Sequence, residues 1–478
     1  MVRGRVESGA PDKGWKGYHS IWLLLFLSWT VLYIDRSITG PVVAWMIDNN
    51  VGFMADAELP FALGGMVGSM FFAGYMLTQF PSGYLGDRFG HRAMIVLSLV
   101  WSGVATMASG LTRGLTSFIA LRVLTGLGEG AYYSNDRAVV CETTPESERS
   151  LGLGLVFTGL ALGMTLAFVF TPLLLAVGEE WLGQDTAWTL PFLIFSIPTL
   201  LLGVVLWRRF EVPKEELWRA GLKLALWSSC FLAALMVVYL ATLYLGFGQL
   251  FQTVAVLLGA VVLIAIIYWR LGASSLALRD RRLIILYLSA IPLLYTLWFF
   301  GFWALMVVSE SSDLGLSGAA VYAALFGLAN GVGYPLGGRL GDLVGNHGRP
   351  RLYVVLCTGV AISVFSIALL VGSGATAIQL GVALFIMGVL FASAQTVHMT
   401  VAGDLSPPGQ RGQTFGMWNL VAEIGAVLAP VLSGVLRDIT GDWTLAILLD
   451  AVLLAVSAIM VSSIWLGRTT KRHALHRQ

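Results

Sequence analysis

Charged residues are scarce in this chain. Only 12% of its 478 residues are Asp, Glu, Lys or Arg, and 57% are hydrophobic, whereas soluble domains carry about 25% charged residues. So few charges cannot cover a surface in contact with water, which excludes a soluble globular protein. The 55 glycines and 16 tryptophans are typical of helical membrane proteins, in which Gly permits close helix contacts and Trp lies at the membrane interfaces.

Cysteine is nearly absent, and the net charge is small. Cys141, Cys230 and Cys357 lie far apart in the sequence and lack the spacing of a disulfide framework or a metal site. A net charge of +2 gives no electrostatic reason to expect a nucleic-acid partner. The sequence also lacks a nucleophile–base arrangement, a phosphate loop and metal-ligand spacing. We therefore expect neither an enzyme nor a cofactor or metal site.

Long apolar runs make up most of the chain. A membrane-spanning helix needs about 20 mostly apolar residues, and we identify fourteen such runs. They cover residues 19–47, 60–86, 93–112, 116–141, 150–177, 188–207, 221–244, 248–269, 283–309, 317–338, 352–372, 376–402, 412–436 and 443–466. The first run is too long for the apolar part of a signal peptide, so we expect it to remain as a span.

The basic residues predict the orientation in the membrane. Of the 29 Lys and Arg, Arg36, Arg122 and Arg137 lie inside runs, and Arg113 and Arg437 lie in loops on one side. All the others lie on the opposite side, together with both chain ends. The positive-inside rule predicts that this basic side is cytoplasmic. We expect a multi-pass protein of the cell (inner or plasma) membrane with both ends in the cytoplasm.

The two halves of the chain repeat a loop pattern. Residues 83–92, Gly-Tyr-Leu-Gly-Asp-Arg-Phe-Gly-His-Arg, follow the second run, and residues 338–345 follow the corresponding run of the second half. Both copies lie on the same side, which predicts parallel repeats of six spans, a transporter architecture. The seventh and eighth runs are then an inserted hairpin. We expect an N-terminal tail over 1–18, a six-helix bundle over 19–210, the hairpin and its flanks over 211–282, a second bundle over 283–467 and a tail over 468–478.

This loop pattern resembles the signature of the major facilitator superfamily. The resemblance implies the all-α fold of that family, with two six-helix bundles plus the hairpin, and fourteen transmembrane helices in all. It also implies a gate on the cytoplasmic side, made by Gly83, Asp87, Arg88, Gly90, Arg92 and Asp342. Charged side chains there can bond to helix ends. The alternative is that Arg88 and Arg92 only fix the orientation.

Further motifs resemble the anion:cation symporter family, which includes galactonate, hexuronate and glucarate proton symporters. They are Tyr33-Ile-Asp35-Arg36 in the first span, Tyr75, Gln79, Pro81 and Gly83 in the second, and Arg122, Gly126, Glu129, Asn135 and Arg137 in the fourth. Ser134 and Glu423 depart from the family pattern, which has Pro and a neutral residue at these places. The hairpin has no counterpart in this family, so the identity of the transported anion is left open.

Ionisable side chains inside the spans mark the functional site, because each is costly in a bilayer. Asp35, Arg36 and Glu129 fall near the middle of the first and fourth spans at about 1.5 Å per residue. Arg36 is suited to bind a carboxylate through two bonds. Desolvation favours the neutral form of Asp35 and Glu129, so these acids can carry protons. Proton uptake would then leave Arg36 available to an anion. We expect Arg122 to pair with Glu129 or Asp35 in the unloaded state. The alternative is that the pairs only fix helix register.

Other polar or aromatic residues in the spans are candidates for lining the site. For substrate binding we select Tyr33, Tyr75, Gln79, Arg122, Tyr133, Tyr295, Trp298, Gln395 and Asn419. Glu423 is a second proton site, a contact for a cation or an internally paired residue. His398 lines a gate or is simply hydrogen-bonded, and Asp450 is left unassigned.

The function that these observations predict is proton-coupled symport of an organic anion, a sugar acid or other carboxylate, by alternating access. Sodium is the alternative coupling ion. We expect the protein to be a monomer embedded in the lipid bilayer. A fourteen-span drug:proton antiporter is the alternative, but residues 158–172 lack the Gly-rich pattern associated with antiporters. A transporter-like sensor or scaffold is a third alternative.

Overall fold

The computed structural model describes residues 15–55, 57–145, 148–270, 279–312, 314–407 and 410–475. Within these ranges the chain forms helices and no strand, as predicted. The α-helices are α1 (Gly17–Ser37), α2 (Thr39–Asp48), α3 (Pro60–Phe89), α4 (His91–Ser109), α5 (Leu115–Glu129), α6 (Tyr133–Thr143), α7 (Arg149–Leu182), α8 (Thr189–Arg209), α9 (Lys214–Tyr244), α10 (Gln249–Arg270), α11 (Arg281–Ser311), α12 (Leu316–Gly372), α13 (Ala377–Leu405), α14 (Arg411–Thr440) and α15 (Thr444–Leu475). A 3-10 helix, Gly52–Met54, follows α2.

Every predicted span contains helix. Twelve helical segments of the described chain are long and apolar enough to cross a membrane. One of them, α12, has 57 residues and would measure about 86 Å if straight, far more than the about 30 Å of a bilayer core. It breaks at Gly345, where φ is +63° and ψ is 176°, and so supplies two crossings.

The predicted fourth span is interrupted. α5 ends at Glu129 and α6 begins at Tyr133, and each is too short to cross alone. Between them the chain tightens, because Tyr132 N bonds to Glu129 O at 2.9 Å, a three-residue turn. The α5–α6 pair makes one crossing, and with the two of α12 the structure agrees with fourteen.

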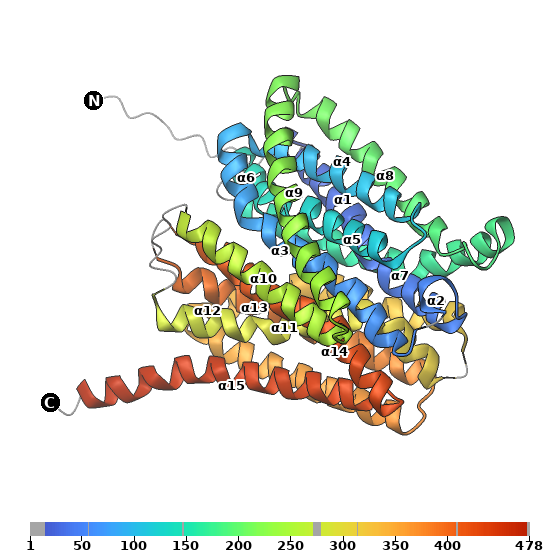
Figure 1. Ribbon diagram of the computed structural model, residues 1–478. Helices are drawn as coiled ribbons and strands as arrows, with labels where there is room; N and C mark the ends of the chain where they lie inside the picture. The colour runs from blue at the N-terminus through green and yellow to red at the C-terminus, as the bar shows by residue number, and fades with distance from the viewer. Residues whose placement is uncertain are drawn as a thin grey trace.

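The helices form two groups joined by the hairpin. In Figure 1, α1–α8 make up one group and α11–α15 the other, and the two converge on the right and diverge toward the left. The hairpin α9–α10 contacts both groups: α9 packs against α3, α4 and α5, and α10 packs against α3 and α14. The inserted pair therefore lies along the boundary of the two groups.

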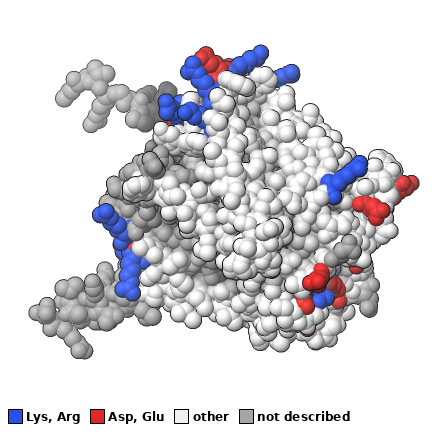
Figure 2. Space-filling model, in the orientation of Figure 1, with Lys and Arg blue, Asp and Glu red and all other residues white. Residues whose placement is uncertain are grey.

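The two ends of the molecule differ in charge. α1 begins and α15 ends on the left of Figure 1, and we call this side the terminal end. Figure 2 shows most of the Lys and Arg on the left and at the top, where some acidic residues lie among them, and most of the Asp and Glu on the right, with a largely uncharged surface between. The right side, where Asp48, Glu179, Glu180 and Glu310 lie at helix ends, is the acidic end.

The two groups are in close contact toward the acidic end. A Cβ atom at Gly65 of α3 would overlap the backbone of Pro430 in α14, and one at Gly434 would overlap Phe61. Only glycine allows backbones this near. Toward the terminal end, by contrast, Gly154 and Gly416 have no such neighbour within 4 Å. The structure is thus a state closed at the acidic end.

Candidate functional site

A buried ion pair links α1 to α5. Arg36 donates from Nε and Nη2 to Oε2 of Glu129, at 3.1 and 2.9 Å. The two side chains are 3% and 0% exposed. Both residues were predicted near the middle of their spans, and the structure brings them together. We expected Arg122 to pair with Glu129 or Asp35, but in this state Glu129 bonds to Arg36, Asp35 bonds to Thr199, and Arg122 bonds to hydroxyl groups.

Aromatic rings surround the guanidinium of Arg36. Its Cζ lies 4.3 Å from the ring centroid of Tyr75, 4.7 Å from Tyr33, 5.2 Å from Phe71 and 5.6 Å from Trp298. These distances allow cation–π attraction. Trp298 belongs to α11 and stacks on Tyr33 of α1 with centroids 5.8 Å apart. Arg36 therefore lies at the boundary of the two groups rather than within one of them.

The contact between α3 and α14 completes this boundary. Asn419 Nδ2 donates to Gln79 Oε1 at 2.9 Å, and to Oε1 of Glu423 at 3.4 Å. The helices run antiparallel, with Phe61 beside Gly434 and Gly65 beside Pro430. Counted one turn from the Gln79–Asn419 bond, Glu423 lies level with Tyr75, whose ring contacts Arg36. Both groups of helices thus contribute acids to one place.

Several polar atoms at this boundary have no partner. Gln79 Nε2, Tyr133 OH, Glu129 Oε1 and Glu423 Oε2 are buried and make no hydrogen bond. Buried polar groups are almost always bonded, and an unmade bond costs about 1–3 kcal/mol. A ligand with its own donors and acceptors would satisfy them. The predicted site residues Arg36, Tyr33, Tyr75, Gln79, Trp298, Asn419, Glu129, Glu423 and Tyr133 all lie along this boundary.

Asp35 and Arg122 lie inside the N-terminal group. Asp35 Oδ2 accepts a bond from Thr199 of α8 at 2.9 Å. Arg122 donates to Ser109 at 2.7 Å and to Thr125 at 3.0 Å. The three bonds stay within that group, so the structure separates Arg122 from the other predicted binding residues. Asp35 Oδ1 has no partner, which leaves one oxygen of this acid free.

Two predicted binding residues of the C-terminal group bond within that group. Tyr295 OH lies 3.1 Å from Ser433 Oγ, and Tyr334 OH donates to Gln395 Oε1 at 3.0 Å. His398 lies between Ser289, at 2.8 Å, and Trp418, at 2.7 Å. The hydrogen-bonded alternative for His398 is therefore confirmed.

Sequence reasoning missed Asn330 of α12. It is fully buried, and both its Nδ2 and Oδ1 lack a partner. An amide in an apolar helix is the signal that could have identified it, as it did for Gln395 and Asn419.

Two of the predicted gating residues, Asp87 and Asp342, each belong to a cluster of acidic and basic side chains in their own half, which we call a clamp. Arg349 bonds Asp342 at 3.2 Å and Asp404 at 2.9 Å. In the first half, His91 lies 3.3 Å from Asp87 and 3.7 Å from Glu142. The basic partners, His91 and Arg349, and the acids Glu142 and Asp404 were not predicted, although the repeated loop pattern pointed to their neighbourhood.

Both clamps stay within their own half, so in this state these bonds do not bridge the groups as the gate prediction expected. Gly90 joins α3 to α4 with φ +94°, and Gly83 faces Ser134. Arg88 and Arg92 lie over the rings of Phe89 and Phe210, a placement that favours the orientation alternative for these two.

The acidic end is closed by a carboxylate at a helix start. Asp438 of α14 accepts bonds from the backbone N–H groups of Phe61 at 3.3 Å and Ala62 at 2.7 Å. These N–H groups begin α3 and have no partner within the helix. The helix dipole adds to the attraction. Asp438 thus fastens the two groups together.

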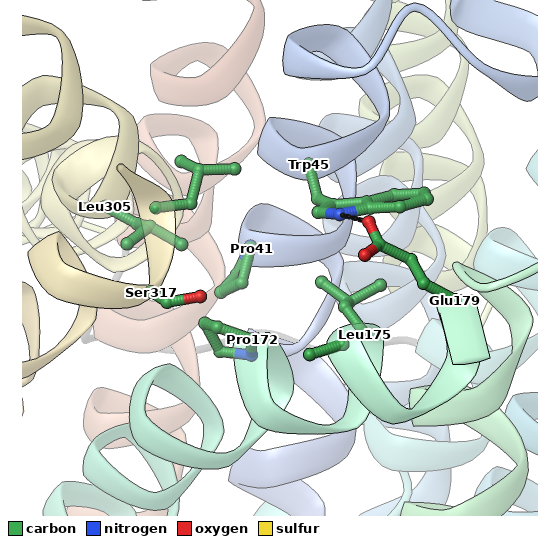
Figure 3. A pocket seen from close by; sticks show the side chains of 9 residues that line it. Pro41, Trp45, Pro172, Leu175, Glu179, Leu305 and Ser317 are labelled. Atoms are coloured by element: carbon green, nitrogen blue, oxygen red, sulfur yellow. Dashed lines mark hydrogen bonds between the residues drawn. The ribbon is translucent and has the colours of Figure 1, made fainter. Parts of the chain in front are cut away.

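A pocket opens at the surface near the acidic end. It is lined by residues of α2, α7, α11 and α12, and Ala176, Glu179 and Ser317 of this lining are exposed. Figure 3 shows Trp45 bonded to Glu179 on one side, with Leu305 and Ser317 opposite. Pro41 at its wall lies five residues beyond Arg36, or about 7.5 Å along the helix. The pocket therefore lies on the acidic side of the ion pair.

Comparisons with known proteins agree with this architecture. The Major Facilitator Superfamily profile matches residues 25–321 and 293–478. The D-galactonate transporter of Escherichia coli O6:H1 is 25% identical over 95% of this chain and 98% of that protein. A probable galactarate/D-glucarate transporter of Bacillus subtilis is 24% identical over 95% and 93%. Other relatives match in part: a probable chloroplastic anion transporter of Oryza sativa is 30% identical over 34% of this chain and 27% of that protein.

Solved structures share the fold. A POT family transporter in complex with 5-aminolevulinic acid has a TM-score of 0.71 at 16% identity, covering 96% of this chain and 98% of that one. The family match, the repeat and the two groups of helices lead to one conclusion: the chain belongs to the Major Facilitator Superfamily and is a membrane transporter, not an enzyme.

Proposed function

We propose that this protein is a secondary transporter that carries an organic carboxylate, such as a sugar acid, together with protons. One observation carries the proposal: the Arg36–Glu129 pair at the boundary of the two groups, beside unpartnered polar atoms from both. A permanently charged guanidinium with a forked donor set matches a carboxylate. The names of the two relatives that match along nearly their whole length, galactonate and galactarate/glucarate transporters, support the same substrate class.

Coupling follows from competition for Arg36. While Glu129 is ionised, its carboxylate holds the guanidinium and repels an incoming anion. A proton on Glu129 neutralises it, so that the substrate carboxylate takes its place beside Arg36. Asp35, with one free oxygen, is the second proton carrier in this proposal. Sodium at these acids is the competing possibility that the experiment below separates.

The proposed orientation places the terminal end in the cytoplasm, because the basic loops lie there. The state described above, closed at the acidic end, is then the one closed to the outside. Alternating access requires the Asp438 bonds to break and the groups to separate there, while the terminal end closes.

Uptake into proteoliposomes tests this function. We expect labelled D-galactonate or D-glucarate to accumulate under an inward proton gradient without sodium. Arg36→Gln should lower uptake about 30-fold or more, the effect of removing one member of a buried charge pair. Arg282→Gln, which removes an arginine at the terminal end, is the matched control and should transport normally.

Because Arg36→Gln leaves Glu129 buried without a partner, the double variant Arg36→Gln/Glu129→Gln guards against misfolding. It should fold and still fail to transport. Normal uptake by either variant would show that Arg36 does not bind the anion. Accumulation that depends on a sodium gradient would show that sodium, and not the proton, is the coupling ion.

A further inference from the structure

Glu423 is an acid that the ion pair does not use. Arg36 is engaged by Glu129, and the hydrogen bond to Glu423 comes from an amide, Asn419, at 3.4 Å. Its other oxygen, Oε2, has no partner, and the residue is 3% exposed. A carboxylate held this way is costly in an apolar interior unless it takes a proton or meets a cation.

The register of α3 and α14 shows what Glu423 faces. Counted one turn from the Gln79–Asn419 bond, it lies level with Tyr75 across the boundary. The ring centroid of Tyr75 lies 4.3 Å from Cζ of Arg36. One positive group and one free acid therefore meet the same ligand from opposite groups of helices. Gln79 Nε2 and Tyr133 OH, also unpartnered, add neutral groups.

The charges define what fits between them. With Glu129 protonated, Arg36 and an ionised Glu423 present one positive and one negative charge. A simple anion would still pair with Arg36, but repulsion from Glu423 would weaken its binding. A molecule with a carboxylate and an ammonium group would satisfy both, and these two buried charges would then each have a partner.

We propose that Glu423 makes this transporter select carboxylates that also bear an ammonium group, such as amino sugar acids or amino acids. The inference rests on the proposed function, since it requires Arg36 to bind the carboxylate. Because the two acids and the guanidinium come from α14, α5 and α1, the ammonium group also connects the substrate to both groups of helices.

Matched ligand pairs test this selection on the purified full-length protein. Thermal unfolding is followed in the presence of D-glucosaminate or D-gluconate, L-alanine or L-lactate, and L-glutamate or L-2-hydroxyglutarate. Within each pair an ammonium replaces a hydroxyl group. We expect the amino member of at least one pair to stabilise the protein at about 30-fold lower concentration.

Glu423→Gln should remove this preference, because glutamine keeps the shape and loses the charge. Asp450→Asn is the control: Asp450 is another fully buried acid, bonded to Thr296 at 2.7 Å within the C-terminal group, and its removal should leave the preference intact.

The outcomes separate the two proposals. Wild-type protein that binds hydroxy acids as well as amino acids, or better, overturns the role of Glu423 and leaves carboxylate transport standing. A preference unchanged in Glu423→Gln also overturns it. If no carboxylate of the panel stabilises the protein, and galactonate and glucarate uptake is absent, both proposals fall.

Discussion

Arg36 and Glu129 make two hydrogen bonds through a single oxygen. Nε and Nη2 of Arg36 both donate to Oε2, at 3.1 and 2.9 Å, while Oε1 of Glu129 stays free. The guanidinium is thus held by one oxygen of an acid that has another to spare. In the proposed mechanism a single proton on Glu129 releases the guanidinium, and the charge of this pair then controls binding.

Glu129→Gln is expected to separate exchange from accumulation. The amide oxygen still accepts from Arg36, so the fold is retained, but the side chain no longer gains or loses a proton. Substrate exchange across the membrane should continue, and accumulation driven by a pH gradient should fall to the level without a gradient. Counterflow measures the exchange and gradient-driven uptake measures the accumulation, both in the same vesicles. Full accumulation by the variant would take Glu129 out of the proton path.

Asp438→Ala should favour opening at the acidic end. The substitution removes the carboxylate that caps α3 from the other group, a contribution of about 0.5–2 kcal/mol, and the groups are then less firmly held. A cysteine at Val431, which is buried where α14 meets Gly65 of α3, should react faster with a membrane-impermeant maleimide when Asp438 is replaced. The measurement requires a background without Cys141, Cys230 and Cys357. Labelling that stays the same or slows contradicts the role of Asp438 as a fastener.

Gly65→Ala and Gly126→Ala should have different consequences. Both new methyl groups would overlap a backbone, at Pro430 and at Phe71 respectively. Gly126 lies between α5 and α3 of one group, so the strain stays in a packed core and lowers the free energy of unfolding by about 1–3 kcal/mol. Gly65 lies between groups that can separate. We expect Gly65→Ala to shift the conformation toward opening at the acidic end, with little loss in melting temperature. Equal destabilisation by the two substitutions would argue against rigid-body movement.

Asp280 provides a pH-dependent cap for α11. Its side chain accepts from the N–H of Arg282 at 2.8 Å and from the guanidinium of Arg282. The Arg282 bonds hold the pKa of the Asp280 carboxyl below its usual value of 3.8. An acid with a lowered pKa stabilises the fold above the pKa of the unfolded chain, and this stability is lost as the pH falls through the folded value.

Asp280→Ala should therefore lower stability by about 1 kcal/mol at neutral pH. The difference from the unsubstituted protein should shrink below about pH 4. Unfolding measured at a series of pH values checks this, and a difference that grows in acid would contradict it.

Hydrophobic length alone predicted most of the helices, because a span must satisfy its backbone internally and bury about 20 apolar side chains. The breaks were not predicted. Gly345 divides α12, and the turn after Glu129 divides the fourth span, because local backbone geometry at a glycine or a tight turn leaves little trace in an apolar pattern.

The sequence by itself determined that this chain lies in a membrane, that its halves repeat, and that Arg36, Glu129 and Glu423 are ionisable groups in apolar helices. Position along a helix gives depth, so the common level of Arg36 and Glu129 could be inferred. Only the tertiary structure decided the partners: Glu129 with Arg36 rather than Arg122, Asp35 with Thr199, and Glu423 level with Tyr75. Partner choice depends on how helices rotate and cross, and close packing at glycines such as Gly65 and Gly126 fixes those angles through contacts between residues far apart in the chain.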